Sequence, residues 1–177
     1  MHGKMYGCNS ERPELALREI SLADAEFIHA LYTGSDFRQG IGDRGITSLQ
    51  DARHYIEQNI RASYQKQGFG LWLVEHQTVA VGICGLVKRD YLPHPDLGFA
   101  LLPDYYGQGL ARCAAARTLE LAREQFQLST LLAITSPTNQ RSQKLLLALD
   151  FKPVPAVVDP HTGQTLDTFA WQAGESQ

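Results

Sequence analysis

Alternating apolar and polar residues predict most of the strands of this chain. The segment LALREI (15–20) alternates as a half-buried strand does. FGLWLVE (69–75) and VAVGICGLVKR (79–89) are separated only by HQT, so they predict an antiparallel hairpin. The other predicted strands are DLGFALL (96–102), LLAIT (131–135) and a closing hairpin of AVV (156–158) and TLDTFAW (165–171).

Capping residues followed by apolar residues at helical spacing predict the helices. One helix begins with Ser21 and has Asp24 three residues later, and the next repeats this capping-box-like start with Ser48 and Asp51. In the second helix one face collects Ala52, Tyr55, Ile56, Ile60 and Tyr64. Two further helices are predicted, from about residue 110 to Phe126 and over RSQKLLLALD (141–150).

The order of these elements is β-α-α-β-β-β-α-β-α-β-β, with antiparallel strands first and a single β-α-β crossover in the middle. A doubly wound Rossmann sheet would alternate throughout, so the order predicts another α/β (α+β) fold, with a mixed, mostly antiparallel sheet of about seven strands and flanking helices. At 177 residues the chain is long enough to close one core without metals or disulfides. We therefore expect a single domain over residues 15–172, preceded by a flexible segment, residues 1–14.

Composition and charge narrow the classes of function. The net charge of −3 gives no reason to expect a nucleic-acid partner. No apolar run approaches membrane-spanning length and the N-terminus lacks the apolar core of a signal peptide, so we expect a cytoplasmic protein that does not bind membranes. Cys8, Cys84 and Cys113 lack the spacing of metal ligands, and their odd number argues against a disulfide framework. We expect no metal, and buried thiols at Cys84 and Cys113.

Two glycines mark the point where the strand at 96–102 gives way to a helix, in LLPDYYGQGLARCAAA (101–116). Such a turn lets backbone N–H groups point at a phosphate, with the positive end of the helix dipole behind them. The alternative is a plain tight turn that needs positive φ. A Walker A loop is excluded by Gly109-Leu110-Ala111, and the dinucleotide fingerprint is excluded by Arg112 at its third glycine.

The stretch YYGQGLA resembles the pyrophosphate loop of the GCN5-related N-acetyltransferases (GNAT), whose motif is Gln/Arg-x-x-Gly-x-Gly/Ala. The chain is most similar to the RimJ/RimL-type branch, over about residues 15–155. The other segments that carry the resemblance are LREISLADAEFIHALY, VGICGLV, DLGFALLPDYYGQGLA and TSPTNQRSQKLLLALDF, which follow the family's order.

The resemblance implies a splayed sheet with acetyl-CoA, and no metal, in the gap between the strands at 96–102 and 131–135. Backbone amides from Gly107 through Gln108, Gly109 and Leu110 to Ala111 would hold the pyrophosphate, while the main chain of Phe99, Ala100 and Leu101 would pair with the pantetheine arm. Asn139 would also hold the pantetheine, and Ser142 would reach the sulfur. Three positions depart from the family: Asp104 replaces Gln or Arg, Asp150 replaces the glycine of Leu-Gly-Phe, and Leu146 stands where many relatives have a tyrosine.

The resemblance implies acetyl transfer to a primary amine by direct attack on the thioester, by a monomer or homodimer. Asp96 matches a glutamate common in relatives that could draw the proton from the amine, or it is a solvent-facing turn residue after Pro95. Ser142 assists the leaving thiolate, or it is a first-turn helix residue that satisfies backbone donors. A non-catalytic module of the same fold that senses acyl-CoA is the alternative function.

The segment TGSDFRQGIGDRGIT (33–47) reads as a loop that no core pattern explains. In the family this segment borders the acceptor cleft, so Asp36 or Asp43 would attract an ammonium, and Arg38 or Arg44 a carboxylate. That combination suits an amino acid, a peptide or protein N-terminus, or a similar zwitterion better than a polyamine. The alternative is a solvated connection whose charges pair with one another.

Overall fold

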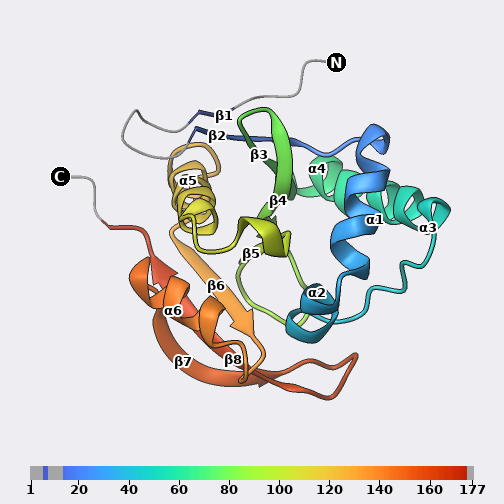
Figure 1. Cartoon of the computed structure of the whole chain (residues 1–177). Helices are drawn as coiled ribbons and strands as arrows, with labels where there is room; N and C mark the ends of the chain where they lie inside the picture. Colours follow the sequence, from blue (N-terminus) through green and yellow to red (C-terminus); the bar gives the residue numbers. More distant parts are fainter. Residues whose placement is uncertain (1–5, 8–13, 175–177) are drawn as a thin grey trace.

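The computed structural model describes residues 6–7 and 14–174, which form one eight-stranded sheet in the order β1-β2-β3-β4-β5-β6-β8-β7 (Figure 1). All neighbouring strands are antiparallel except β5 and β6, which are parallel. The strands are β1 (Tyr6–Gly7), β2 (Leu15–Glu19), β3 (Leu71–His76), β4 (Val79–Val87), β5 (Asp96–Leu101), β6 (Thr130–Thr135), β7 (Lys152–Val158) and β8 (Thr165–Gln172).

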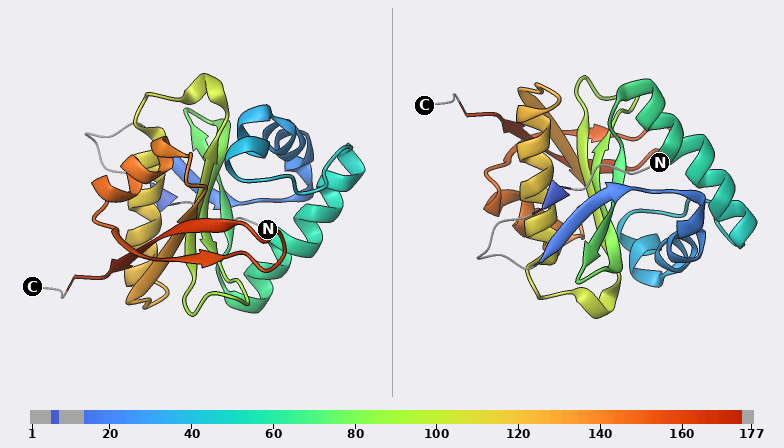
Figure 2. Two further views of the ribbon diagram at one scale, coloured as in Figure 1. Left: turned by 90° about the horizontal axis from the view of Figure 1, so that it is seen from below. Right: turned by 90° about the horizontal axis from the view of Figure 1, so that it is seen from above.

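Helices cover both faces of the sheet. The helical elements are η1 (Leu22–Asp24), α1 (Ala25–Thr33), α2 (Ser35–Gly40), α3 (Leu49–Tyr55), η2 (Ile56–Arg61), α4 (Ala62–Gln67), η3 (Pro103–Tyr105), α5 (Leu110–Glu124) and α6 (Gln140–Ala148). The first helices, through α4, gather on one side of the central strands, while α5 lies on the other (Figure 2). Two buried clusters result, one under α5 and one under α1 and α3, and residues of the central strands contribute to both.

Most of the sequence-based elements are confirmed. Ser21 with Asp24 and Ser48 with Asp51 both form capping boxes. Ala52, Ile56 and Ile60 are buried and Tyr55 and Tyr64 pack beside them, which confirms the predicted helical face. Gln77 and Thr78 turn the β3–β4 hairpin with φ of 50° and 68°. Cys84 and Cys113 are buried free thiols, as expected.

Two local predictions differ from the structure. Residues 35–40 form helix α2 where a loop was predicted, because Phe37 is buried and its ring lies 4.2 Å from that of Tyr32. The eighth strand, β1, is a two-residue pairing with β2 inside the predicted flexible segment. The remainder of that segment, apart from Glu14, lies outside the described residues.

The parallel junction between β5 and β6 opens the sheet. β5 pairs with β4 along its whole length, but it shares with β6 only the pair Asp96↔Leu132 at its start. Beyond that pair the edge of β5 that faces β6 has no strand partner. Because every second residue of a strand turns its N–H and C=O to a given edge, the later part of β5 presents backbone groups to the gap.

Candidate active site

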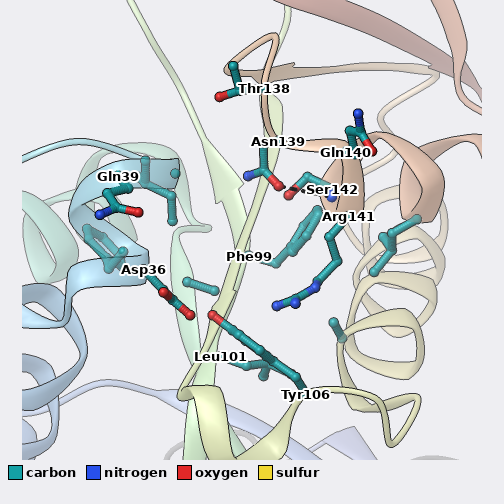
Figure 3. A pocket seen from close by; sticks show the side chains of 16 residues that line it. Asp36, Gln39, Phe99, Leu101, Tyr106, Thr138, Asn139, Gln140, Arg141 and Ser142 are labelled. Carbon is teal, nitrogen blue, oxygen red and sulfur yellow. Dashed lines mark hydrogen bonds between the residues drawn. The ribbon is translucent and has the colours of Figure 1, made fainter.

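A cavity of about 470 Å³ lies at this opening, between the end of β5 and the first turns of α2 and α6. Figure 3 shows its side chains converging from these three elements and from the turn before α5. Among the residues predicted to bind acetyl-CoA, those that line this cavity are Phe99, Ala100, Leu101, Ala111, Asn139 and Ser142. The structure thus brings together residues from three separate segments of the sequence.

The two glycines before α5 are consistent with both sequence-based interpretations, a turn that binds phosphate and a tight turn that needs positive φ. Gly107 and Gly109 each have a φ of 76°, so a side chain at either position would strain the backbone. An added Cβ at either glycine would nevertheless meet nothing within 4 Å, so the space beside the turn is open. Neither glycine, nor Gln108, lines the cavity itself; all three are exposed, and the Leu110 side chain is buried in the core.

The first turn of α5 supplies donors next to this open space. The first hydrogen bond of the helix runs from the backbone N–H of Cys113 to Gly109 O, at 3.1 Å. The N–H groups before Cys113 therefore have no partner inside the helix. Within the described part of the chain, no side-chain hydrogen bond caps this end of the helix. An anion beside Gly109 would therefore meet free N–H groups and the positive end of a 15-residue helix dipole.

Asn139 and Ser142 occupy the start of α6. Asn139 is the N-cap residue, and its Oδ1 accepts a hydrogen bond of 3.2 Å from the backbone N–H of Ser142. The first turn is therefore capped by Asn139 and not by Ser142, whose half-buried hydroxyl lines the cavity. This arrangement leaves the Ser142 hydroxyl available to a ligand.

Three polar side chains of this cavity, those of Asp36, Tyr106 and Arg141, lie close to one another. The Arg141 guanidinium stacks over the Tyr106 ring, with Cζ 4.0 Å from the ring centroid. Partial burial and the neighbouring Asp36 carboxylate raise the pKa of Tyr106, and Arg141 opposes that rise. The Tyr106 hydroxyl points toward Asp36 (Figure 3). The sequence singled out Asp36 of this cluster as a candidate acceptor-binding residue, whereas Tyr106 and Arg141 were only part of the YYGQGLA and Asn-x-x-Ser segments.

A second cavity, of about 530 Å³, meets the first. Phe99, Asn139 and Ser142 line both, so the two spaces adjoin at the middle of β5 and the start of α6. The second cavity extends under the segment after α2 and along β6 toward the β7–β8 turn. Its charged lining residues are Arg38, Asp43, Arg44, Arg89, Asp96 and Asp159.

Asp96 is buried in the wall of this second cavity, which excludes the solvent-facing alternative. Its side chain is 1% exposed and its Oδ1 accepts from Arg89 Nε at 3.0 Å. Burial raises the pKa of Asp96 above the ordinary carboxyl value, and the positive charges of Arg89 and Arg44 offset part of that rise. A carboxylate with a raised pKa beside a substrate-sized cavity has the properties of a general base.

The four charged residues of the segment 33–47 divide between the two cavities. Asp36 lines the first, whereas Arg38, Asp43 and Arg44 line the second. Asp43 also accepts a hydrogen bond from the backbone N–H of Gly45 at 2.8 Å. Within the described ranges none of the four forms an ion pair, so their charges do not pair with one another as the solvated-loop alternative required.

A family model, the acetyltransferase (GNAT) domain, matches residues 14–152. The chain belongs to the GNAT acetyltransferases. This membership makes it an acetyl-CoA-dependent acyltransferase and confirms the resemblance inferred from the glycine turn. The chain is 24% identical over 147 residues to YoaA of Bacillus subtilis (strain 168), described as an uncharacterized N-acetyltransferase, with 80% of this chain and 81% of YoaA covered.

The fold of this acetyltransferase matches solved structures of the RimJ/RimL type. RimL, a ribosomal L7/L12 alpha-N-protein acetyltransferase, has a TM-score of 0.80 at 14% identity, covering 98% of this chain and 96% of RimL. Mycobacterium smegmatis RimJ, solved with CoA-disulfide, has a TM-score of 0.79 at 17% identity, covering 98% of this chain and 90% of RimJ. Over residues 6–7 and 14–174 no helix has the length and apolar character needed to cross a membrane. Nor do His, Cys, Asp and Glu side chains of those residues form a cluster that could hold a metal ion.

Proposed function

We propose that this acetyltransferase moves the acetyl group of acetyl-CoA to a primary amine that carries an anionic group nearby, by direct attack of the amine on the thioester. The single observation that carries the proposal is that two cavities meet at Phe99, Asn139 and Ser142. One cavity has the features of a site for CoA and the other is lined by charges of both signs.

Acetyl-CoA fits the first cavity and the turn beside it. The open space at Gly107 and Gly109, next to the free N–H groups of α5, suits the pyrophosphate. The unpartnered edge of β5 near Phe99, Ala100 and Leu101 suits an extended pantetheine arm that pairs with the main chain. The bound cosubstrate supplies an activated acetyl group and a thiolate leaving group.

The residues at the junction then have three tasks. The attacking amine must lose a proton, the oxyanion must meet N–H donors, and the departing sulfur must gain a proton. Asp96 takes the amine proton, directly or through water, and a backbone N–H near Leu101 stabilises the oxyanion. The Ser142 hydroxyl passes a proton to the sulfur and takes one back from solvent in the same step, since Leu146, where many relatives have a tyrosine, is buried and has no proton to give.

Substitution of Ser142 by alanine tests the role of its hydroxyl. We expect Ser142→Ala to lower kcat about tenfold, the effect of losing one hydrogen bond made in the transition state, with little change in KM for acetyl-CoA. Ser35→Ala, at an exposed serine of α2, serves as the control and should retain both constants. An unchanged kcat in Ser142→Ala at every pH would show that solvent protonates the sulfur.

Substitution of Arg44 tests the acceptor site. Arg44 lines the second cavity, and its positive charge opposes the rise that burial causes in the pKa of Asp96, Tyr32 and Tyr91. We expect Arg44→Ala to raise KM for the acceptor about tenfold or more, since a charged hydrogen bond is lost, while acetyl-CoA binding measured by calorimetry stays intact. Faster turnover of spermidine than of any amino acid or peptide would contradict a zwitterionic acceptor.

The proposed function as a whole is tested by release of the CoA thiol over a panel of amines. The panel holds amino acids, peptides with free N-termini, and polyamines, and mass spectrometry identifies each acetylated product. We expect transfer to at least one zwitterionic amine. Binding of acetyl-CoA without release of thiol from any amine would favour the sensing module instead.

A further inference from the structure

Two buried hydroxyl groups of the second cavity have no hydrogen-bond partner among the residues that the structure describes. They belong to Tyr91, in the turn between β4 and β5, and Thr135, at the end of β6. Thr135 is 7% exposed. Buried hydroxyl groups in proteins are nearly always paired with the chain, with water or with a ligand, so these two can pair with a molecule that enters the cavity.

The charged groups of the same cavity single out one further free donor. Asp96 pairs with Arg89, Asp43 accepts from the backbone N–H of Gly45, and Asp159 accepts from that of His161. Arg38 donates to the carbonyl of Ile46. Of the charged lining residues, Arg44 alone has no hydrogen bond or ion pair with another described residue.

All three free groups can donate. A guanidinium and two hydroxyls present donors and one positive charge, which is the complement of a carboxylate. The carboxylates of the cavity cannot take this role, because they accept hydrogen bonds and do not donate them.

We propose that Arg44, Tyr91 and Thr135 bind a carboxylate of the acceptor, and that the acceptor is therefore a free α-amino acid. The inference rests on the proposed function and narrows its acceptor. In a peptide or protein N-terminus the first carboxyl group is an uncharged amide, which would leave Arg44 without an anion. The peptide would also have to continue past Tyr91 and Thr135, whose hydroxyls are buried.

The test compares each α-amino acid with its own amide, which keeps the amine and side chain but has no carboxylate. For the best acceptor we expect kcat/KM to exceed that of the amide by on the order of 10–100-fold, because a site built to bind a polar group rejects analogues that lack it. Binding of the same pair to the chain saturated with CoA, measured by calorimetry, gives a readout independent of transfer.

Variants assign this preference to the two hydroxyls. We expect Tyr91→Phe and Thr135→Val each to reduce the ratio of acid to amide several-fold, with the constants for the amide unchanged. Thr168→Val is the matched control, since that buried threonine of β8 donates to the carbonyl of Leu166 and should leave the ratio unaltered. An amide or peptide used as well as the amino acid, or a ratio that neither variant moves, overturns the inference.

The outcomes also separate this inference from the proposed function. If peptides are acetylated and no amino acid is, the carboxylate site is wrong while acetyl transfer to an amine stands. If no amine releases the CoA thiol, the proposed function fails, and calorimetry still decides whether an amino acid binds more tightly than its amide. Equal binding of the two would overturn the carboxylate site in that case.

Discussion

Gly109→Val should abolish binding of acetyl-CoA. Gly109 has a φ of 76°, and an added Cβ there would meet nothing within 4 Å, so the valine side chain would occupy the open space proposed for the pyrophosphate. The free N–H groups of α5 would then be screened from the phosphate oxygens. We expect affinity to fall by at least about 100-fold in calorimetry, the loss of two or more charge-assisted hydrogen bonds.

Backbone strain must be separated from this steric effect. Forcing a branched residue to positive φ costs about 1–2 kcal/mol in itself. Gly68→Val is a matched control, because Gly68 ends α4 with a φ of 80° and open surroundings, and it should bind acetyl-CoA normally. Gly109→Asn supplies a side chain that tolerates positive φ and should also lose binding. Retained affinity in Gly109→Asn would mean that the glycine serves the turn alone.

Asp96→Asn should lower kcat/KM by about 100-fold or more near neutral pH, the usual contribution of a positioned general base. Asparagine cannot take the amine proton. In alkali the free amine is already abundant, so the loss should shrink as pH rises. Equal loss at every pH would contradict the role of base and indicate a structural one.

The pH profile of the native chain also tests the role of Asp96 as a base, because that role predicts the direction in which the rate changes with pH. The base must be ionised, so the rate should fall as pH drops through the pKa of Asp96, which burial raises above the ordinary carboxyl value. Arg89→Gln removes a positive charge that lowers this pKa, so we expect the acid limb to move to higher pH. Both variants break a buried ion pair, at a cost of about 3–5 kcal/mol, and their melting temperatures should therefore fall together.

Local sequence rules were sufficient for most of the fold. Alternation around His76-Gln77-Thr78 predicted the β3–β4 hairpin because strand period and turn are both encoded within a few residues. Helix α2 was missed because its sequence, SDFRQG, has a single apolar residue, Phe37, which is buried only by long-range packing against Tyr32. Tertiary contacts therefore decided this element, which local patterns could not.

In the candidate site too, local motifs revealed some residues, while others depend on contacts that only the fold makes. The glycine turn and the Asn-x-x-Ser segment were found because a family motif marks them. The Asp96–Arg89 pair and the contact of Tyr106 with Arg141 were not, since each joins separate elements and depends on the side-chain directions that the fold sets. The two unpaired hydroxyls, of Tyr91 and Thr135, have no sequence signature at all, because burial without a partner is a property of the folded chain.

A crystal structure of the chain with bound CoA tests the central claim most directly, that acetyl-CoA lies in the first cavity and presents its thioester to the second. We expect pyrophosphate oxygens within about 3 Å of backbone nitrogens in residues 107–111. The sulfur should lie at the junction lined by Phe99, Asn139 and Ser142. A pyrophosphate bound away from the glycine turn, or a sulfur that does not reach this junction, would contradict the account.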